Sequence, residues 1–366
     1  MILKKLTVIA ASAYCFVFPH YIYGDYKHQY HYVKSEYQAS KHALDNGKVQ
    51  SSFNMTHSAK PDQRLNDALK TPHGFDINDS YMCKIAQHYN VTCKAIKRFA
   101  IDRIRRDFQL EKEKQKREQE TISPYAPYTI EPKTHRIWIT SPHAPQEVPR
   151  DRLAFYNMSL QFYLDKPFEH HFWCNGKHLI PQSISIIESF NIQIIIHELS
   201  EVEESFIAKN LYRKLLRDNM FSFAGKIARQ EILIQHGGLY ADIGMMQLQD
   251  IEWYFKKYEL VLPIKRTSMD NHFLAAKKGT NFFSTSLALI KPLMLLVKEK
   301  KAFIEPYHLF TFLDVRIWKL VAAMENCTLS ELGFFYEETH YKQHGLNSWS
   351  KNILKITIPY LIDWED

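Results

Sequence analysis

The sequence predicts an α/β fold built around a mostly parallel sheet. Short apolar stretches of strand character, at 135–140, 169–174 and 193–197, alternate with stretches of helical periodicity. A longer amphipathic stretch, 222–236, then runs through a glycine pair into the apolar segment 239–243. Of the 366 residues, 45% are hydrophobic and 14% are aromatic, which is enough for a sizeable core. Strands that alternate with helices indicate a parallel sheet with a Rossmann-like order.

The individual elements follow from the local pattern of the chain. Runs of β-branched and aromatic residues predict the strands, and apolar residues spaced three and four apart predict the helices. A proline-rich segment, 123–128, separates this pattern from the preceding chain, and the domain is expected to span 131–366. We expect strands at 135–140, 169–174, 193–197, 239–243, 260–264 and 270–276, and helices at 148–163, 183–190, 222–236, 250–257, 282–298 and 307–324.

The first 24 residues have the layout of a secretory signal peptide. Lys4 and Lys5 precede a short apolar run, and Gly24 supplies a small residue near a cleavage point. Pro19 interrupts this run, which is short for a membrane span of ~20 apolar residues. We therefore expect an exported protein, either secreted or associated with a membrane through its N-terminus.

The chain between the signal and the α/β domain divides into two parts. Residues 25–70 are polar and lack apolar periodicity, which is typical of a weakly ordered linker. Residues 71–121 regain helical periodicity, and within them 80–106 resemble a helix-turn-helix with Asn90 at the turn. DNA binding is therefore an alternative function, although the export signal argues against a nucleic-acid partner.

Charge, cysteines and missing motifs exclude several classes of protein. The formal net charge of +7 favours anionic partners such as nucleotide phosphates or acidic lipids. The five cysteines form no CxxC pair, so no structural zinc is expected, and only Cys83 and Cys93 are placed for a disulfide, with free thiols as the alternative. No GxGxxG or P-loop occurs, which argues against a dinucleotide dehydrogenase and a P-loop NTPase.

The amphipathic stretch 222–236 and the strand after it carry the main functional signal. Its apolar residues share one arc of a helical wheel, and Lys226 and Arg229 lie on the other side. The glycine pair 237–238 follows, where a helix end needs a left-handed conformation. Asp242 then stands at the carboxyl end of a strand, where open α/β sheets bind ligands. The alternative is that this carboxylate is a turn or cap residue.

The run from Arg229 to Asp242 resembles the signature of glycosyltransferases with a sugar-binding DXD motif. This group includes the Och1-type and capsular sugar transferases and, more distantly, the catalytic domains of the large clostridial glucosylating toxins. The chain keeps the arginine, the glycine pair, the tyrosine and the first aspartate of that signature. His135-Arg-Ile-Trp138 resembles the first strand of the family, and Ser348-Trp349 resembles its C-terminal loop, so the resemblance covers 131–366.

The resemblance implies a GT-A fold and the transfer of a sugar from a UDP- or GDP-sugar donor to a protein or glycan acceptor, with retention of configuration. It implies that Ile137 and Trp138 line the pocket for the base, where an indole offers a flat face for stacking. It further implies that Tyr240, Asn271 and Trp349 bind the nucleotide sugar.

The chain departs from the family signature twice. Lys226 stands where the family has an aspartate before the arginine, and Gly244 stands where the second aspartate of DXD belongs. A Mn²⁺ or Mg²⁺ ion would then be held by Asp242 with Asn347 and Ser348 of the C-terminal loop. These departures bear directly on metal and sugar binding.

The alternative to a divalent cation is charge supplied by the protein. Lys226 and Arg229 place two cations within one helical turn and could neutralise a diphosphate without a metal. The prediction is thus a glycosyltransferase with Asp242, Arg229 and Lys226 in its catalytic centre. A catalytically inactive protein that binds nucleotide sugars on the same fold is the alternative that Gly244 suggests.

Overall fold

The computed structural model describes residues 86, 89–97, 122–123, 125–265, 268–269, 271–299, 317–327, 331–336 and 340–343. All of them lie in one compact unit, Arg64–Asp366. The predicted signal 1–24, the linker 25–70 and most of the helical region 71–121 fall outside the described residues. No helix among the described residues is both long enough and apolar enough to cross a membrane.

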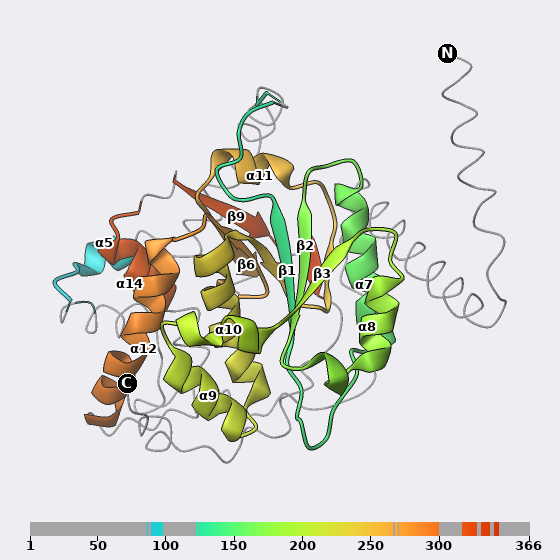
Figure 1. Cartoon of the computed structure of the whole chain (residues 1–366). Helices are drawn as coiled ribbons and strands as arrows, with labels where there is room; N and C mark the ends of the chain where they lie inside the picture. Colours follow the sequence, from blue (N-terminus) through green and yellow to red (C-terminus); the bar gives the residue numbers. More distant parts are fainter. Residues whose placement is uncertain are drawn as a thin grey trace, which may run out of the picture. The chain divides into compact units, whose positions relative to one another are not determined.

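An eight-stranded sheet forms the centre of the described structure (Figure 1). Its order is β3-β2-β1-β4-β8-β6-β7, and β9 pairs with β6. The strands are β1 (Lys133–Trp138), β2 (Glu169–Cys174), β3 (Ile194–Glu198), β4 (Gly238–Ala241), β6 (Leu260–Lys265), β7 (Ser268–Met269), β8 (Phe273–Ala276) and β9 (Leu332–Tyr336).

Most of these strands run in the same direction, which confirms the predicted α/β class with a mostly parallel sheet. β1 is parallel to both β2 and β4, β2 is parallel to β3, and β6 is parallel to β9. β8 is antiparallel to both β4 and β6, and β7 is antiparallel to β6. The reversal follows from the short connection between β6 and β8, because a parallel crossover needs a dozen or more residues.

Helices cover both faces of the sheet (Figure 1). One face packs against α7 (Arg150–Leu160), α8 (Pro181–Glu188) and α11 (Glu252–Lys257). The other packs against α9 (Lys209–Arg217), α10 (Phe221–His236), α12 (Asn281–Glu299) and α14 (Ile317–Met324). Four short 3-10 helices complete this part: η2 (Gln161–Tyr163), η3 (Lys177–Leu179), η4 (Leu199–Glu201) and η5 (Glu203–Ser205).

The predicted elements agree with the structure within a few residues, but helix α9, strand β9 and the shorter elements were not predicted. The strand predicted at 135–140 begins earlier, at Lys133. Two short strands, β5 (Met245–Gln247) and β10 (Tyr341–Gln343), form a separate antiparallel sheet. Three residues are too few to show a period of two, which explains why these strands were not predicted. Only 317–324 of the predicted helix 307–324 lies among the described residues.

The described part of the predicted helix-turn-helix, 80–106, contains one turn and one short helix. Asn90 has a left-handed φ of 56°, and α5 (Cys93–Lys97) follows after Thr92, whose hydroxyl accepts the N–H of Ala95. Ala86 is fully buried in the main core. DNA binding by this segment stays a prediction.

The described cysteines include both a disulfide-bonded residue and free thiols, the two states that the sequence left open. Cys93 is disulfide-bonded, and its partner lies outside the described residues. Cys174 and Cys327 are free thiols. Burial raises the pKa of both thiols, so they stay protonated and behave as small apolar side chains.

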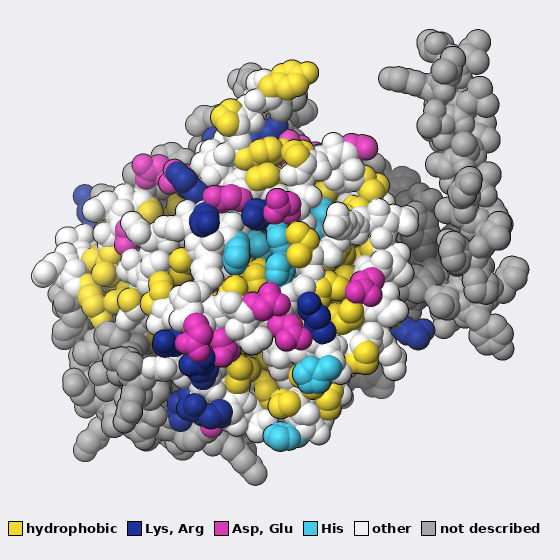
Figure 2. Space-filling view, in the orientation of Figure 1, with side chains coloured by type: hydrophobic (Ala, Val, Ile, Leu, Met, Phe, Trp, Pro, Cys, Tyr) yellow, Lys and Arg dark blue, Asp and Glu magenta, His cyan; other side chains and the backbone are white. Residues whose placement is uncertain are grey.

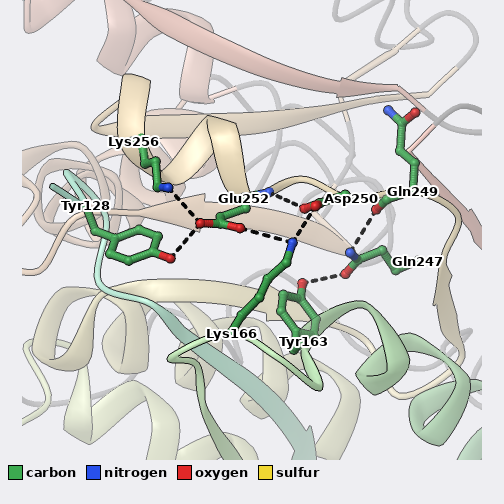
Figure 3. A network of polar contacts seen from close by, with 8 residues as sticks. All are labelled: Tyr128, Tyr163, Lys166, Gln247, Gln249, Asp250, Glu252 and Lys256. Carbon is green, nitrogen blue, oxygen red and sulfur yellow. Dashed lines mark hydrogen bonds and ion pairs between the residues drawn. The ribbon is translucent and has the colours of Figure 1, made fainter. Parts of the chain in front are cut away.

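A network of hydrogen bonds and ion pairs connects the segment before β1 to helix α11 (Figure 3). The Glu252 carboxylate accepts a hydrogen bond of 2.7 Å from the Tyr128 hydroxyl and pairs with Lys256 at 2.8 Å and Lys166 at 3.1 Å. Burial alone would raise the pKa of Glu252, but these three partners bring it to about 2. Beside them Tyr163 donates to Gln247 of β5 at 2.5 Å. The network therefore joins segments about 120 residues apart in the chain.

Candidate functional site

The connections of the sheet reverse direction between β1 and β4. From β1 the chain passes through α7 to β2 and through α8 to β3, on one face of the sheet. It then returns through α9 and α10 on the opposite face to β4, which lies on the other side of β1. Open α/β sheets bind ligands at the carboxyl ends of strands where the order reverses in this way. The ends of β1 and β4 are therefore the place to look for a site.

Asp242 directly follows β4 at this position, and its side chain is 28% exposed. Its Oδ1 accepts a hydrogen bond of 2.5 Å from the Tyr240 hydroxyl and lies 3.3 Å from Nη2 of Arg229. Its Oδ2 lies 3.6 Å from Nε2 of His272. Groups from β4, from α10 and from the segment before β8 thus converge on one carboxylate.

Tyr240 keeps its proton in this arrangement. Its ring is buried, and burial raises the pKa of its hydroxyl well above the usual 10. The hydroxyl therefore acts as a donor to Asp242 at neutral pH. The Arg229 guanidinium lies 4.7 Å from the centre of the Tyr240 ring, which adds a cation–π contact to the pair.

Arg229 orients Asp242 and uses most of its donors within the protein. Its side chain is 7% exposed. Besides the contact with Asp242, it donates to the carbonyl oxygens of Asn271 and, at 3.4 Å, Gly225. A planar guanidinium can reach several acceptors at fixed angles, which an ammonium cannot do. We therefore assign it as a positioning residue.

Arg136 was not predicted as part of the site. It lies in the middle of β1, is almost fully buried, and donates from Nη1 to the Asp242 carbonyl at 2.6 Å and to the Met245 carbonyl at 3.4 Å. The Met245 N–H also donates to the Asp242 carbonyl, at 2.8 Å, which closes a turn. Burial lowers the pKa of Arg136, but an arginine stays charged at neutral pH. A cation inside a buried strand was the signal that could have identified it.

The predicted donor-binding residue Asn271 reaches the site through its backbone, and its neighbour His272 reaches it through its ring. Asn271 is buried, and its carbonyl oxygen accepts from Arg229. His272 accepts the Asp242 N–H at its carbonyl, at 2.8 Å, and its ring is 21% exposed beside the carboxylate. His272 carries the partly accessible polar side chain here, and its position one residue after Asn271 was the available signal.

Ile137 and Trp138, the predicted base-pocket residues, lie at the same edge on opposite faces of the sheet. Ile137 is buried in the core cluster under α10. Trp138 is half-buried and packs on the side of α7 and α8, where its indole N–H donates to the Gln146 carbonyl at 2.9 Å. The Arg152 guanidinium lies 5.9 Å from the indole ring. Their role in binding a base stays a prediction.

Lys226 lies one turn before Arg229 on α10 and is half-buried. Its Nζ is 5.9 Å from the centre of the Phe223 ring. The other predicted residues, Asn347, Ser348 and Trp349, lie outside the described residues.

Geometry explains both glycines of the Gly237-Gly238 pair. They have φ values of 66° and 94°, a region that residues with a Cβ resist. A Cβ on the first would lie 1.9 Å from the Glu131 carboxylate, and one on the second would lie 2.6 Å from the Lys133 carbonyl. By contrast, a Cβ on Gly225 would meet nothing within 4 Å, so open space lies beside α10 one turn before Arg229.

The donor set around Asp242 fits a divalent cation poorly. Gly244, at the position of the missing second aspartate, is a buried part of the turn that Met245 closes. Nowhere in the part of the chain that the structure describes do three or more His, Cys, Asp or Glu side chains form a group that could hold a metal. The one carboxylate at the site is already shared between Arg229 and Tyr240.

Glu231, on α10, belongs to the fold. It is fully buried and accepts the Ala208 N–H at 2.8 Å, so it satisfies a backbone donor at the N-terminal end of α9. Burial raises its pKa to about 7. Its position on the apolar arc of α10 is the sequence feature that indicates this structural role.

A second polar cluster, the histidine cluster, lies at the C-terminal end of α10. Its members are His135, His171, Trp173, His197 and His236. The His171 and His197 rings stack at 5.3 Å, with Nδ1 of the first 3.0 Å from Nε2 of the second. The Trp173 indole stacks on His197 at 4.1 Å. Figure 2 shows histidine side chains gathered on this face of the molecule between acidic and basic groups.

Burial keeps the histidine cluster neutral. It lowers the pKa of His171 from 6.5 to about 4, aided by the neighbouring His197, and it lowers that of His236 to about 4. The fully buried His135 has its pKa lowered well below the usual value, and its Nε2 lies 2.8 Å from the Gly237 carbonyl. A neutral stacked cluster of this kind contributes packing rather than charge.

Comparison with known proteins gives fold neighbours only. No protein-family model and no curated protein matches the sequence. Among solved structures, the PaToxG glycosyltransferase is similar at 13% identity and a TM-score of 0.41, over 54% of this chain and 69% of that one. The ligand-free glycosyltransferase domain of the YGT toxin is similar at 10% identity and a TM-score of 0.40, over 58% of this chain and 80% of that one. Mouse xyloside xylosyltransferase 1 is similar at 8% identity and a TM-score of 0.36, over 65% of this chain and 95% of that one.

Proposed function

We propose that this protein is a glycosyltransferase of the GT-A fold that moves a sugar from a UDP- or GDP-sugar donor to a protein or glycan acceptor. The observation that carries the proposal is the position of Asp242, at the reversal point of a mostly parallel sheet, with its carboxylate oriented by Tyr240 and Arg229. These three residues and the glycine pair 237–238 are the ones that resemble the family signature.

Sugar transfer makes two demands that this arrangement suits. The bond from the anomeric carbon to the diphosphate oxygen breaks, a bond to an acceptor hydroxyl oxygen forms, and the acceptor proton leaves. The donor must therefore be held rigidly while negative charge grows on its diphosphate. Oδ1 of Asp242 already accepts a hydrogen bond from Tyr240, and Oδ2 is directed toward His272. Oδ2 is therefore the oxygen to accept a hydrogen bond from a hydroxyl of the nucleotide sugar. Retention of configuration is proposed from the family resemblance.

The test is turnover of nucleotide sugars by the purified chain. We expect release of UDP or GDP in the presence of a suitable donor, and a fall of about 100-fold in that rate for Asp242→Asn. The matched control is Asp250→Asn, in the polar network of Figure 3 and outside the site, which should keep the rate. If no donor is turned over and no nucleotide raises the melting temperature, the proposal is wrong.

The alternative is a catalytically inactive protein that binds nucleotide sugars, which Gly244 and Lys226 favour because each replaces a carboxylate of the family signature. Binding of UDP or GDP without turnover of any UDP- or GDP-sugar, across a panel of acceptors, would establish this alternative. The same measurements therefore distinguish the two functions.

We also propose that the protein is exported, either secreted or membrane-associated through its N-terminus. The signal-like first 24 residues support this, and so does the disulfide at Cys93, since disulfides persist in oxidising compartments. N-terminal sequencing of the protein from the producing cell would show whether the signal is removed, and an intact N-terminus in a cytosolic fraction would contradict export.

A further inference from the structure

The charges around Asp242 allow a deeper statement about how the donor is bound, and it rests on the proposed function. A divalent cation needs carboxylate lone pairs that are free to coordinate it. Here Oδ1 of Asp242 already accepts from the Tyr240 hydroxyl at 2.5 Å and faces Arg229 at 3.3 Å. A metal at this oxygen would have to displace a hydrogen bond and a buried ion pair.

The second oxygen offers little more to a cation. Oδ2 lies 3.6 Å from Nε2 of His272, so a metal would compete there with an imidazole edge. The position that would supply a second carboxylate is Gly244. The residues that the resemblance implies as further ligands, Asn347 and Ser348, are neutral, so they would not replace the missing negative charge.

The net charge of the groups in contact with Asp242 also disfavours a divalent cation. Two guanidinium groups contact Asp242, Arg229 at its carboxylate and Arg136 at its carbonyl oxygen, 2.6 Å away. Both are almost fully buried, where charges interact more strongly than in water. Among the described residues in contact with Asp242, one carboxylate and two guanidiniums leave a surplus of positive charge, which repels a dication and attracts a diphosphate.

We infer that this chain binds the diphosphate of its donor without a divalent cation, with Asp242 acting as a fixed hydrogen-bond acceptor and the charge being supplied by Arg136, Arg229 and Lys226. The two buried arginines act through the potential they create, because their donors are engaged within the protein. Lys226, half-buried one turn before Arg229, is the side chain assigned to direct contact with phosphate.

The decisive experiment is UDP and GDP binding by calorimetry on the full chain, in EDTA and in Mn²⁺. We expect the dissociation constants in the two conditions to agree within about twofold. Binding that requires Mn²⁺, or tightens tenfold or more with it, would overturn the inference and leave the proposed function intact. Absence of binding in both conditions would reject the proposed function, and this inference with it.

A gain-of-function variant gives a second, independent measurement. Gly244 does not have a positive φ, so its backbone can accept a side chain. We expect Gly244→Asp to create Mn²⁺-dependent UDP binding, about tenfold tighter with the ion than without, and Gly244→Asn to create none. Mn²⁺ dependence already present in the unmodified chain, and unchanged in Gly244→Asp, would contradict the inference.

The role of Lys226 is tested in EDTA. Lys226→Met should weaken UDP binding about tenfold and reduce its salt dependence, with no change in melting temperature. The control is Lys278→Met, an exposed lysine beside Gly237 at the opposite end of β4, which should bind UDP normally. Unchanged UDP affinity in Lys226→Met would remove that residue from the proposal.

Discussion

Helix α10 contributes to two polar clusters, about 10 Å apart along its axis. The two clusters accommodate buried polar side chains in different ways. At its C-terminal end, His236 joins three other histidines and Trp173 in a stack whose members stay neutral. At its centre, Arg229 stays charged and is paired with Asp242. Both clusters lie on the α10 face of the sheet, the histidine cluster at β1, β2 and β3 and the Asp242 site at the end of β4.

The difference indicates which cluster can act on a ligand. Buried polar groups must be hydrogen-bonded, and buried charges must be paired. The histidine cluster avoids an unpaired buried charge because its rings stay neutral and stack on one another, although Nε2 of His236 has no hydrogen-bond partner within the described part of the chain. The Asp242 site meets the rule by pairing, and it keeps a carboxylate and an imidazole that are each partly exposed.

The largest expected effect comes from breaking the charged cluster with Arg229→Lys. A lysine cannot contact Asp242, Asn271 and Gly225 at once, so we expect the transfer rate to fall about 100-fold and the free energy of unfolding to fall by about 2–3 kcal/mol. Urea unfolding and donor turnover measure the two quantities.

The matched control for that variant is Arg213→Lys on α9. Arg213 also pairs with carboxylates, those of Glu203 and Glu204, but at the surface. We expect both its free energy of unfolding and its transfer rate to stay close to those of the unmodified chain, because solvent screens an exposed ion pair. Equal losses in both variants would mean that the Asp242 site is no more constrained than the surface.

The next effect tests the close packing around the glycine pair beside the histidine cluster. In Gly238→Ala the new Cβ would lie 2.6 Å from the Lys133 carbonyl and 3.1 Å from Nε2 of His135, at a φ of 94°. We expect a loss of about 3 kcal/mol in the free energy of unfolding, measured by urea unfolding. A loss below about 1 kcal/mol would show that β1 and β4 separate easily.

The third effect is the pH dependence of the histidine cluster. The folded-state pKa values of His171 and His236, about 4, lie below the usual 6.5 of an unfolded chain. The unfolded state therefore binds protons first, so stability is complete above about pH 6.5 and is lost as the pH falls toward 4. We expect about 3 kcal/mol less free energy of unfolding at pH 5 than at pH 7.5, since partial exposure reduces the full shift.

A variant at a single histidine sharpens this test. His171→Gln should remove about one proton from the uptake that accompanies unfolding between pH 6 and 5. A free energy of unfolding that stays level from pH 7.5 to 5 would contradict the neutral state of the cluster.

The smallest effect probes the open side of the Asp242 site. Gly225→Ala adds a Cβ that meets nothing within 4 Å, inside a helix where alanine is preferred to glycine. We expect the free energy of unfolding to rise by about 0.5–1 kcal/mol, seen as a higher melting temperature. A decrease would mean that the space beside Gly225 is filled by a part of the chain outside the described residues.

The sequence predicted those helices and strands in which apolar residues recur with a clear period. Strand β2 was predicted at its observed bounds, and α10 within one residue at its start, because burial on both faces or on one arc leaves a clear pattern. The antiparallel direction of β8 and the three-residue strands β5 and β10 were not predicted. They depend on connection length and on pairing between distant segments, which local patterns do not encode.

The sequence predicted some of the residues around Asp242 and not others. Asp242, Tyr240 and Arg229 were expected together from one continuous stretch, and the structure brings them into contact. Arg136 comes from β1 and His272 from the segment before β8, and only tertiary packing places them beside Asp242. The family resemblance implied a base pocket lined by Ile137 and Trp138, and the structure places these two side chains on opposite faces of the sheet, because successive strand residues alternate. Their role in binding a base stays a prediction.

The pairing of β5 with β10 gives the site a built-in exchange reporter. Met245, three residues after Asp242, pairs with Gln343, and among the described strands β5 has no other partner than β10. The Leu248 N–H, directly after β5, donates to the carbonyl of His340, directly before β10, at 2.9 Å, so slow exchange of this amide with heavy water requires β10 to be in place. Deuterium uptake at Leu248 would then report, without any substrate, how often β10 separates from the strand that follows the Asp242 turn.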